Sequence, residues 1–201
     1  MNQTDYCFPI LGIEFDIKQL QADVLNSRLA PRVSEKDVPI STVNLTHIPG
    51  TTGEDRFYKN RHGHEKLAAL GIREEHFSIM PQEVKDTYLG ECLSSLMLLH
   101  LEKTGQAFCG RIQIIWINPE TCHKMHKDLH TPYRYHIPVF THPNCLWVFK
   151  EAEGVSTLHM PADGRAWAFD PVAAHHSVAN MSPMRRCHVV LADGAKLCNT
   201  V

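Results

Sequence analysis

The chain has 201 residues, about the length of one domain, and with 43% hydrophobic residues it can bury a full core without disulfide staples. The formal net charge of −2 excludes the strongly basic composition of nucleic-acid-binding domains and of proteins drawn to anionic membranes. Seven scattered cysteines without a Cys-x-x-Cys pair, and an acidic N-terminus unlike a signal peptide, lead us to expect a cytoplasmic protein.

The first half of the chain combines strands and helices. The apolar run CFPILGI predicts a strand, and Asp16 is placed to cap a helix whose apolar residues share one face. VPISTVNLTHI predicts a second strand. The polar, glycine-bearing stretch 50–64 predicts a long loop, for which a solvated surface loop and a lid over a binding site are alternatives. Pro81 can open a second helix that ends before Gly105.

From about residue 108 the pattern changes to short apolar runs separated by turn sequences such as Asn-Pro, Glu-Gly and Ala-Asp-Gly. The runs are RIQIIWI, RYHIPVF, CLWVFK, VSTLHM, RAWAFD, HSVAN and CHVVLAD. Successive antiparallel strands predict a sandwich, barrel or jelly roll. We therefore predict one domain over 1–201, in which 1–107 forms a mixed α/β support with the lid and 108–193 forms a β core.

A histidine-rich segment, CHKMHKDLH, follows the first of these later strands. It contains His126-x-Asp128, which alone proves little, because a chain with 14 histidines produces such triplets by chance. Three later stretches strengthen it: RYHIP (134–138), GRAWAFD (164–170) and HHSVANMSPMRRCHVVLAD (175–193). The functional argument depends on all four elements occurring in this order.

Together these elements resemble the aspartyl/asparaginyl β-hydroxylase-like branch of the iron(II)- and 2-oxoglutarate-dependent dioxygenases, which includes bacterial free-proline hydroxylases. The resemblance covers about Arg111 to Asp193. It implies a mainly β fold with flanking helices, the double-stranded β-helix of jelly-roll, cupin-like proteins. It also implies a dioxygenase that uses Fe(II), 2-oxoglutarate and O2. Such an enzyme would hydroxylate an aliphatic C–H of an amino acid, free or peptidyl, and release succinate and CO2.

The resemblance implies that His126, Asp128 and His176 are the catalytic metal ligands. Two imidazoles and one carboxylate on one face of iron(II) leave positions open for the cosubstrate and dioxygen. Alternate residues of a strand share a face, so we expect His126 and Asp128 to leave one strand together. We expect His176 to arrive from a strand of the facing sheet.

Three further residues are expected to bind the cosubstrate. By the spacing of the family, the resemblance implies that Arg186 binds the distal carboxylate of 2-oxoglutarate, a role that suits a permanently charged, fork-shaped guanidinium. His136 matches a histidine that contacts the cosubstrate in the family. Arg134 matches the arginine of the family's Arg-x-His element, for which the cosubstrate and a substrate carboxylate are alternative ligands. Trp167 and Phe169 are expected to pack beneath the metal-binding strands.

The register of the last element is open by one residue. His175 and Arg185 repeat the ten-residue spacing of His176 and Arg186 one position earlier. We favour His176 and Arg186, because His188 then completes the Arg-x-His pattern of the family.

Two other functions are alternatives. A cupin-like dioxygenase that does not use 2-oxoglutarate typically binds its metal through three histidines, which would leave Asp128 and Arg186 without a role. An inactive jelly-roll binding module would bury these charges without a ligand, which is costly. We expect an amino acid or peptide as the substrate, no nucleic-acid partner and no membrane partner, and the sequence leaves a homodimer open.

Overall fold

The computed structural model describes residues 6–25, 38–50, 71–128 and 133–194. The strands are β1 (Cys7–Glu14), β2 (Ile40–Asn44), β3 (Gly110–Ile117), β4 (Thr121–Cys122), β5 (Tyr133–Phe140), β6 (Cys145–Glu151), β7 (Gly154–Leu158), β8 (Arg165–Phe169), β9 (His175–Asn180) and β10 (Arg186–Asp193). The helices are α1 (Ile17–Leu25), the single 3-10 turn η3 (Glu74–His76), α3 (Gln82–Lys85) and α4 (Tyr88–Thr104).

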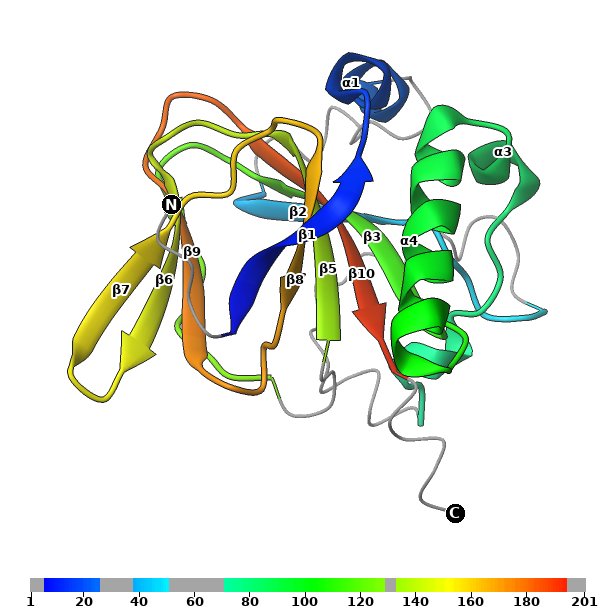
Figure 1. The fold of residues 1–201 in the computed structure, drawn as a ribbon. Coiled ribbons are helices and arrows are strands. Elements are labelled where there is room, and N and C mark those ends of the chain that lie inside the picture. The colour runs from blue at the N-terminus through cyan, green and yellow to red at the C-terminus, as the bar shows by residue number, and fades with distance from the viewer. Residues whose placement is uncertain (1–5, 26–37, 51–70, 129–132, 195–201) are drawn as a thin grey trace.

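Two antiparallel sheets face each other (Figure 1). The larger has the strand order β1-β8-β5-β10-β3-β2, and the smaller has the order β4-β9-β6-β7. This arrangement confirms the predicted mainly β, jelly-roll class. The larger sheet also takes in β1 and β2, one at each edge, so strands from the first half of the chain complete a sheet whose centre comes from the second half.

The helices begin and end where the local sequence provides caps. The Asp16 carboxylate accepts the backbone N–H groups of Lys18 and Gln19 at 3.0 and 3.1 Å, which confirms the predicted cap of α1. The single helix predicted after Pro81 is wrong, because the chain forms two helices with an extended Thr87 between them. The Thr87 hydroxyl caps α4 instead, and α4 ends at the left-handed Gly105.

The other predicted elements can be compared directly with the structure. Every strand predicted from the apolar runs is present, and the two-residue β4 was not predicted. The predicted lid, 50–64, lies outside the described residues apart from Gly50. No helix among the described residues is long and apolar enough to cross a membrane. No disulfide joins any two of the six cysteines in the described part of the chain.

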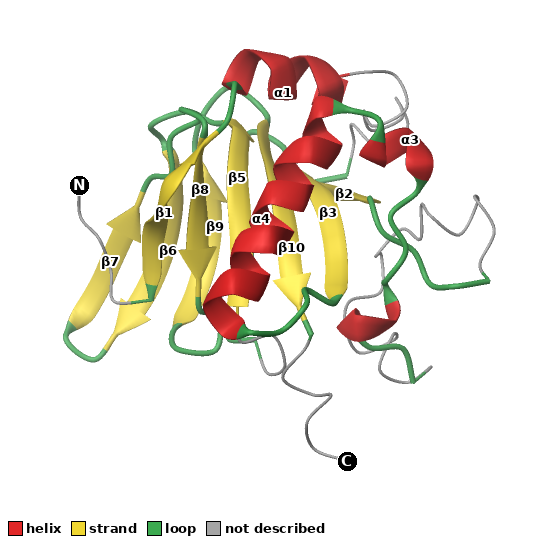
Figure 2. Cartoon of the chain, turned by 45° about the vertical axis from the view of Figure 1, so that its right-hand side comes forward, coloured by secondary structure: helices red, strands yellow, loops and turns green. Residues whose placement is uncertain are grey.

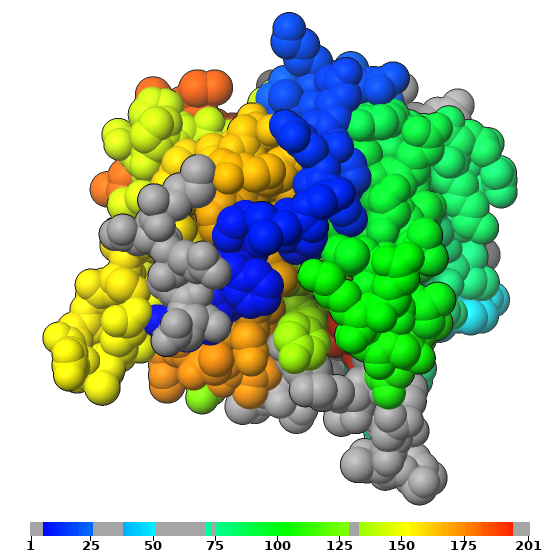
Figure 3. All heavy atoms as spheres, viewed as in Figure 1, coloured from blue at the N-terminus to red at the C-terminus, as the bar shows by residue number. Residues whose placement is uncertain are grey.

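Strand β10 shows how the larger sheet separates two environments. Its odd-numbered residues from 187 to 191 belong to the apolar cluster that also contains the buried face of α4. Figure 2 shows α4 lying across the outer face of this sheet, and in Figure 3 α4 covers that side of the molecule together with α1 and β1. The even-numbered residues from 186 to 192 point the other way, toward the smaller sheet. The helix α4 therefore covers the outer face of the sheet, and the inner face is free to carry polar groups.

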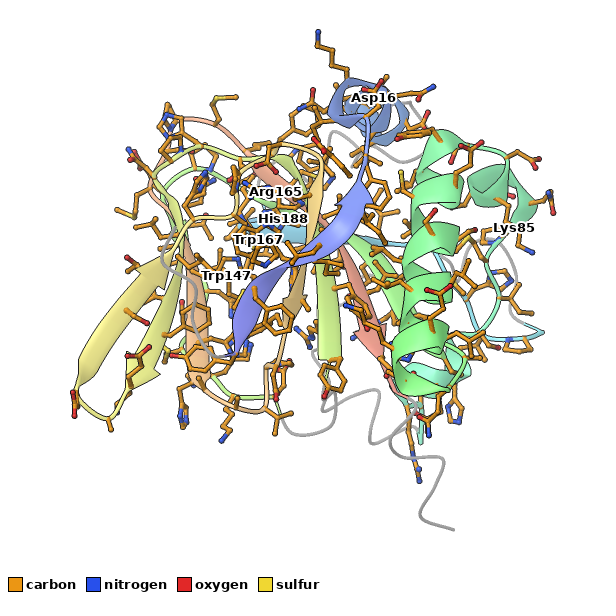
Figure 4. All side chains as sticks on the ribbon, in the orientation of Figure 1. Asp16, Lys85, Trp147, Arg165, Trp167 and His188 are labelled. Atoms are coloured by element: carbon orange, nitrogen blue, oxygen red, sulfur yellow. The ribbon has the colours of Figure 1, made fainter. Side chains whose placement is uncertain are left out.

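Aromatic side chains fill part of the space between the sheets. Trp147, Phe149, Trp167 and Phe169 belong to a second buried cluster, and Figure 4 shows Trp147, Trp167 and His188 gathered in this interior. The ring of Phe169 meets the ring of His176 edge-on, with centroids 4.8 Å apart. These aromatic rings give the histidine a rigid apolar support, as we expected of Phe169.

Candidate active site

The structure brings His126, Asp128 and His176 together. One potential ligand atom from each residue lies within 4.8 Å of the others. The backbones of His126 and His176 pair as an isolated antiparallel bridge, with N–H···O distances of 2.9 and 2.7 Å in the two directions. The Asp128 N–H donates to the carbonyl of Pro171 at 3.1 Å, which holds the backbone of Asp128 beside this bridge.

The positions of the two histidines correct two expectations. His126 and Asp128 do not lie on a strand, because β4 ends at Cys122 and the chain continues as an extended segment. His176 does not come from the facing sheet, because the bridge to His126 places both histidines along the smaller sheet. The alternation of an extended chain still turns His126 and Asp128 to the same side.

Both histidines present the ring nitrogen that a metal ion needs. Nδ1 of His126 lies 2.7 Å from the carbonyl oxygen of Lys124, and Nδ1 of His176 lies 3.1 Å from that of Ala174. A carbonyl can only accept, so each Nδ1 carries a hydrogen, and it is Nε2 that offers the lone pair of the neutral imidazole to a metal ion. Burial lowers the pKa of His176 to about 4, so this imidazole is neutral near neutral pH. The donor set fits iron(II), which is commonly bound by two imidazoles and a carboxylate.

Arg134 fixes the carboxylate of Asp128. Its guanidinium nitrogen lies 2.6 Å from Oδ2 of Asp128, close enough for a strong ion pair. The N–H groups are not aligned for a hydrogen bond, so Oδ2 has no hydrogen-bond donor among the described residues. Oδ1 lies 3.7 Å from Nε2 of His126. Arg134 thus holds the carboxylate in place beside the two histidines while leaving its oxygens able to bind a cation.

Arg186 is a buried cation on the inner face of the larger sheet. Only 4% of the residue is exposed, and one guanidinium nitrogen donates to Nδ1 of His188 at 2.9 Å. The guanidinium also lies over the ring of Trp147, 5.5 Å from its centroid. Within the described part of the chain, no carboxylate forms an ion pair with Arg186. Burial lowers its pKa to about 10, so it stays charged at neutral pH and the site favours an anion.

His136 lies between the metal-binding triad and Arg186. Burial, with smaller contributions from the neighbouring Arg186 and Arg134, lowers its pKa well below the ordinary value for histidine. The residue is only 3% exposed, and yet neither of its ring nitrogens has a hydrogen-bond partner among the described residues. A buried imidazole in this state favours a bound ligand or water as its missing partner.

These groups line one cavity of about 550 Å³ between the sheets. Trp147 connects its parts, because the indole lies 5.9 Å from the ring of His176, 5.0 Å from that of His136 and against Arg186. Its indole nitrogen has no hydrogen-bond partner among the described residues. The volume is in the range of small-molecule binding sites.

The side chains of the two alternative registers, the pair His175 and Arg185 and the pair His176 and Arg186, lie in different environments. His175 is exposed, whereas His176 is buried and reaches the cavity. Arg185 donates to the hydroxyl of Ser41 at 3.3 Å and lies over the ring of Trp116, but Arg185 itself is not among the residues that line the cavity. The geometry therefore favours His176 and Arg186. Their roles as metal ligand and cosubstrate-binding residue are still predictions.

Sequence reasoning missed two cavity residues. The sequence does not distinguish Trp147 as a cavity residue, because an inward tryptophan on a strand gives the same pattern in a core and in a binding site. Arg111, at the start of the run RIQIIWI, had no predicted role, yet it is buried and lines the cavity. The alternation of Arg111 with Gln113 in an otherwise apolar strand is the signal that could have identified it.

The sequence matches no protein-family model and no curated protein. Among solved structures, the chain is similar to an oxidoreductase of the 2OG-Fe(II) oxygenase family from Burkholderia pseudomallei. The identity is 13%, the match covers 94% of this chain and 86% of that one, and the TM-score is 0.52. A prolyl-4-hydroxylase from Pseudomonas putida matches at 14% identity over 64% of this chain and 75% of that one, with a TM-score of 0.44. The first match shows that this chain shares the fold of a 2OG-Fe(II) oxygenase family member.

Proposed function

We propose that this protein is an Fe(II)- and 2-oxoglutarate-dependent dioxygenase that hydroxylates an aliphatic C–H of an amino acid, free or peptidyl. The observation that carries the proposal is one cavity that holds both halves of the required site. Two imidazoles with their Nε2 atoms available lie beside Asp128, and the buried guanidinium of Arg186 lines the same cavity. The shared oxygenase fold supports the proposal, and the resemblance to the β-hydroxylase-like branch suggests the substrate class.

In this proposal, each group of the cavity has a defined task. His126, Asp128 and His176 would hold iron(II), and Arg134 would orient the carboxylate of Asp128. Iron(II) with 2-oxoglutarate and O2 supplies oxidation of a C–H group to C–OH, with succinate and CO2 as the other products.

The remaining groups would bind the cosubstrate and exclude water. Arg186 would bind the distal carboxylate of 2-oxoglutarate through charge-assisted hydrogen bonds, positioned by the contact with His188. His136 would offer a ring nitrogen to the same ligand, since the protein leaves both nitrogens without a partner. Trp147 would form a wall between the metal-binding triad and the carboxylate-binding site at Arg186, and would exclude water from both.

The test is turnover of 2-oxoglutarate by the purified protein loaded with iron(II). The proteinogenic amino acids and short peptides are supplied one at a time, and succinate is measured together with the substrate mass. We expect one substrate class to stimulate succinate formation in step with the gain of one oxygen atom. The matched control is His126→Ala, which removes a proposed ligand at the half-buried end of the site.

Other results would identify the alternatives. Oxygen incorporation without consumption of 2-oxoglutarate would indicate a cupin-like dioxygenase of another type. Binding of iron and ligands without any oxidation across the panel would indicate an inactive binding module. Either result contradicts the proposed function.

A further inference from the structure

The side of the cavity formed by β2 and β3 carries a patch of aliphatic side chains. Ile40 on β2 pairs with Ile117 on β3, and Ile115 lies two residues before Ile117, so the three side chains share the inner face of the larger sheet. All three line the cavity, and we call them the isoleucine patch. Ile40 and Ile115 are half-buried, so apolar surface of the patch is open to the cavity.

Val178 connects this patch to the proposed iron site. It follows His176 by two residues on β9, so the two side chains point to the same face, with roughly 7 Å between their Cα atoms. Val178 lines the cavity and belongs to the same buried cluster as Ile117, against which the rest of the isoleucine patch packs. A molecule that covers the patch therefore lies close to the metal-binding triad.

The strand order separates the patch from the groups of β5 that are proposed to bind the cosubstrate. Arg134 and His136 are on β5, the patch is on β3 and β2, and β10 runs between them. Arg186, on β10, pairs with Ile117. A dicarboxylate held between Arg186 and the triad on the β5 side therefore leaves the β3 side for a second molecule, which would lie next to it.

Gln113 adds one fixed polar group to this side of the cavity. It lies two residues before Ile115 on the same face of β3, lines the cavity and is 8% exposed. Its Nε2 donates to Oδ1 of Asn44 at 2.8 Å, which holds the side-chain amide in place. Within the described part of the chain, Oε1 of Gln113 has no hydrogen-bond donor. A buried acceptor in this state favours a bound N–H group.

Apolar surface beside one acceptor matches a molecule that combines an aliphatic group with an N–H group. Covering apolar surface stabilises a bound aliphatic group. A carboxylate or carboxamide placed on the same surface would lose its water without gaining a hydrogen-bond partner.

We propose that the isoleucine patch and Gln113 bind the substrate, so that the patch contacts an uncharged aliphatic side chain and Gln113 accepts a hydrogen bond from the neighbouring N–H group. This inference rests on the proposed function and narrows its substrate class to aliphatic residues. The N–H group has two sources, the amino group of a free amino acid or the backbone amide of a peptide.

The experiment measures binding to the protein loaded with iron(II) and 2-oxoglutarate without oxygen. The probes are pairs of similar shape, leucine with asparagine and valine with threonine, each as the free amino acid and as its N-acetyl methylamide. The leucine probes are also supplied without the amino or acetylamino group, as 4-methylpentanoate and its methylamide.

The variants change one part of the proposed site at a time. Ile115→Asn and the milder Ile115→Thr make the patch polar, whereas Ile115→Leu keeps it apolar. Gln113→Met removes the acceptor at similar length. Val155→Thr is the control, because Val155 is an exposed residue of β7 and does not line the cavity.

We expect leucine or valine to bind roughly 10-fold or more tightly than its polar counterpart, a discrimination typical of an apolar pocket. Ile115→Asn should largely remove this preference, Ile115→Thr should reduce it and keeps the test valid if the asparagine variant does not fold, and Ile115→Leu should retain it. Gln113→Met should weaken the leucine probe roughly 10-fold and leave its analogue without the nitrogen group unchanged. The affinity for 2-oxoglutarate should stay nearly constant throughout, and Val155→Thr should bind like the wild type.

The outcomes separate this inference from the proposed function. Equal or tighter binding of the polar probes, a preference unchanged by both polar variants of Ile115, or no binding of any probe would overturn the inference. So would an equal loss for leucine and its analogue in Gln113→Met, or a parallel loss of 2-oxoglutarate affinity in the polar Ile115 variants, which would assign the patch to the cosubstrate. Binding of the free amino acids alone, or of the methylamides alone, supports the inference and identifies the source of the N–H group. Ile115-dependent selection of aliphatic probes by a protein that binds no 2-oxoglutarate would support the aliphatic subsite while contradicting the proposed function.

Discussion

At the level of single residues, the hydrogen bonds to Nδ1 determine which nitrogen of each histidine faces the cavity. The carbonyls of Lys124 and Ala174 hold the hydrogen on Nδ1 of His126 and His176. Both carbonyls lie two residues before the histidine they contact, so the local backbone sets the tautomer before any ligand binds. This arrangement lets the protein present a metal site without a large rearrangement.

The first prediction tests this site through metal binding. His176→Ala should remove stoichiometric binding of Co(II), a spectroscopic substitute for iron(II), because one of three ligands is lost. Asp128→Glu should bind poorly, since the added methylene moves the oxygen away from the two Nε2 atoms. The visible absorption of the Co(II) protein is the measurement.

His175→Ala is the matched control for that prediction, because the side chain is exposed and adjacent. It should bind Co(II) like the wild type. Loss of binding in His175→Ala with retention in His176→Ala would show that the register is displaced by one residue.

The second prediction concerns Arg186. Arg186→Ala should weaken 2-oxoglutarate binding by roughly 2–5 kcal/mol, or about 30-fold to several-thousand-fold, because a buried carboxylate loses its charge-assisted partner. Arg186→Lys should recover part of this loss, since an ammonium lacks the fork geometry. Titration of 2-oxoglutarate into the metal-loaded protein without oxygen gives the affinities.

Arg185→Ala serves as the comparison, because Arg185 does not line the cavity and its guanidinium lies over the ring of Trp116. It should leave the affinity for 2-oxoglutarate unchanged. If Arg185→Ala weakens binding and Arg186→Ala does not, the preferred arginine is wrong. If neither variant changes binding, the 2-oxoglutarate assignment itself fails.

At the level of elements, the strands could be predicted because their apolar runs are short and separated by strong turn sequences. The break between α3 and α4 could not, because the apolar spacing continues through Thr87 and only its extended backbone interrupts the helix. Residue types and order suggested the metal-binding triad. Its placement along one sheet depends on the long-range bridge between His126 and His176, which no local pattern encodes.

The third prediction tests the junction of α3 and α4 through Gly90. Glycine in a helix normally destabilises it by about 0.5–1 kcal/mol relative to alanine, so Gly90→Ala would ordinarily stabilise α4. Here an added Cβ would lie 2.3 Å from the carbonyl oxygen of Val84 and 2.7 Å from Cα of Lys85. We therefore expect Gly90→Ala to lower the free energy of unfolding by about 1–3 kcal/mol, measured by urea denaturation.

Ser95→Ala, at an exposed site on the same helix, is the control for this prediction and should change the free energy of unfolding by less than about 0.5 kcal/mol. A stabilising effect of Gly90→Ala would contradict the close approach.

At the level of the whole molecule, the two sheets enclose a polar interior that is unusually rich in histidine. The buried histidines between them are His136, His176 and His188. The larger sheet is apolar toward the helices and polar toward the cavity, so the fold stabilises itself on one face and keeps the other for chemistry. The cost of this arrangement is that protonation of the buried imidazoles destabilises the folded state, because a charged group is unfavourable in the interior.

The last prediction follows from that cost. Burial lowers the pKa of both His136 and His188 well below the ordinary value for histidine, and the nearby charge of Arg186 makes a smaller contribution in the same direction. In the unfolded chain, histidine has a pKa of about 6.5. Below about pH 6.5 the unfolded state therefore binds more protons than the folded state. The stability that comes from burying these imidazoles in the neutral form is fully present above that pH. It is lost progressively as the pH falls toward the pKa values of the two histidines in the folded protein. Each such histidine adds a slope of about 1.4 kcal/mol per pH unit to the free energy of unfolding in that window.

Urea unfolding of the metal-free protein between about pH 7.5 and pH 5 measures the slope. His136→Phe should reduce it by about 1.4 kcal/mol per pH unit, while the exposed His175→Gln should leave it unchanged. An identical slope in the wild type and His136→Phe would mean that His136 is not held neutral in the folded protein.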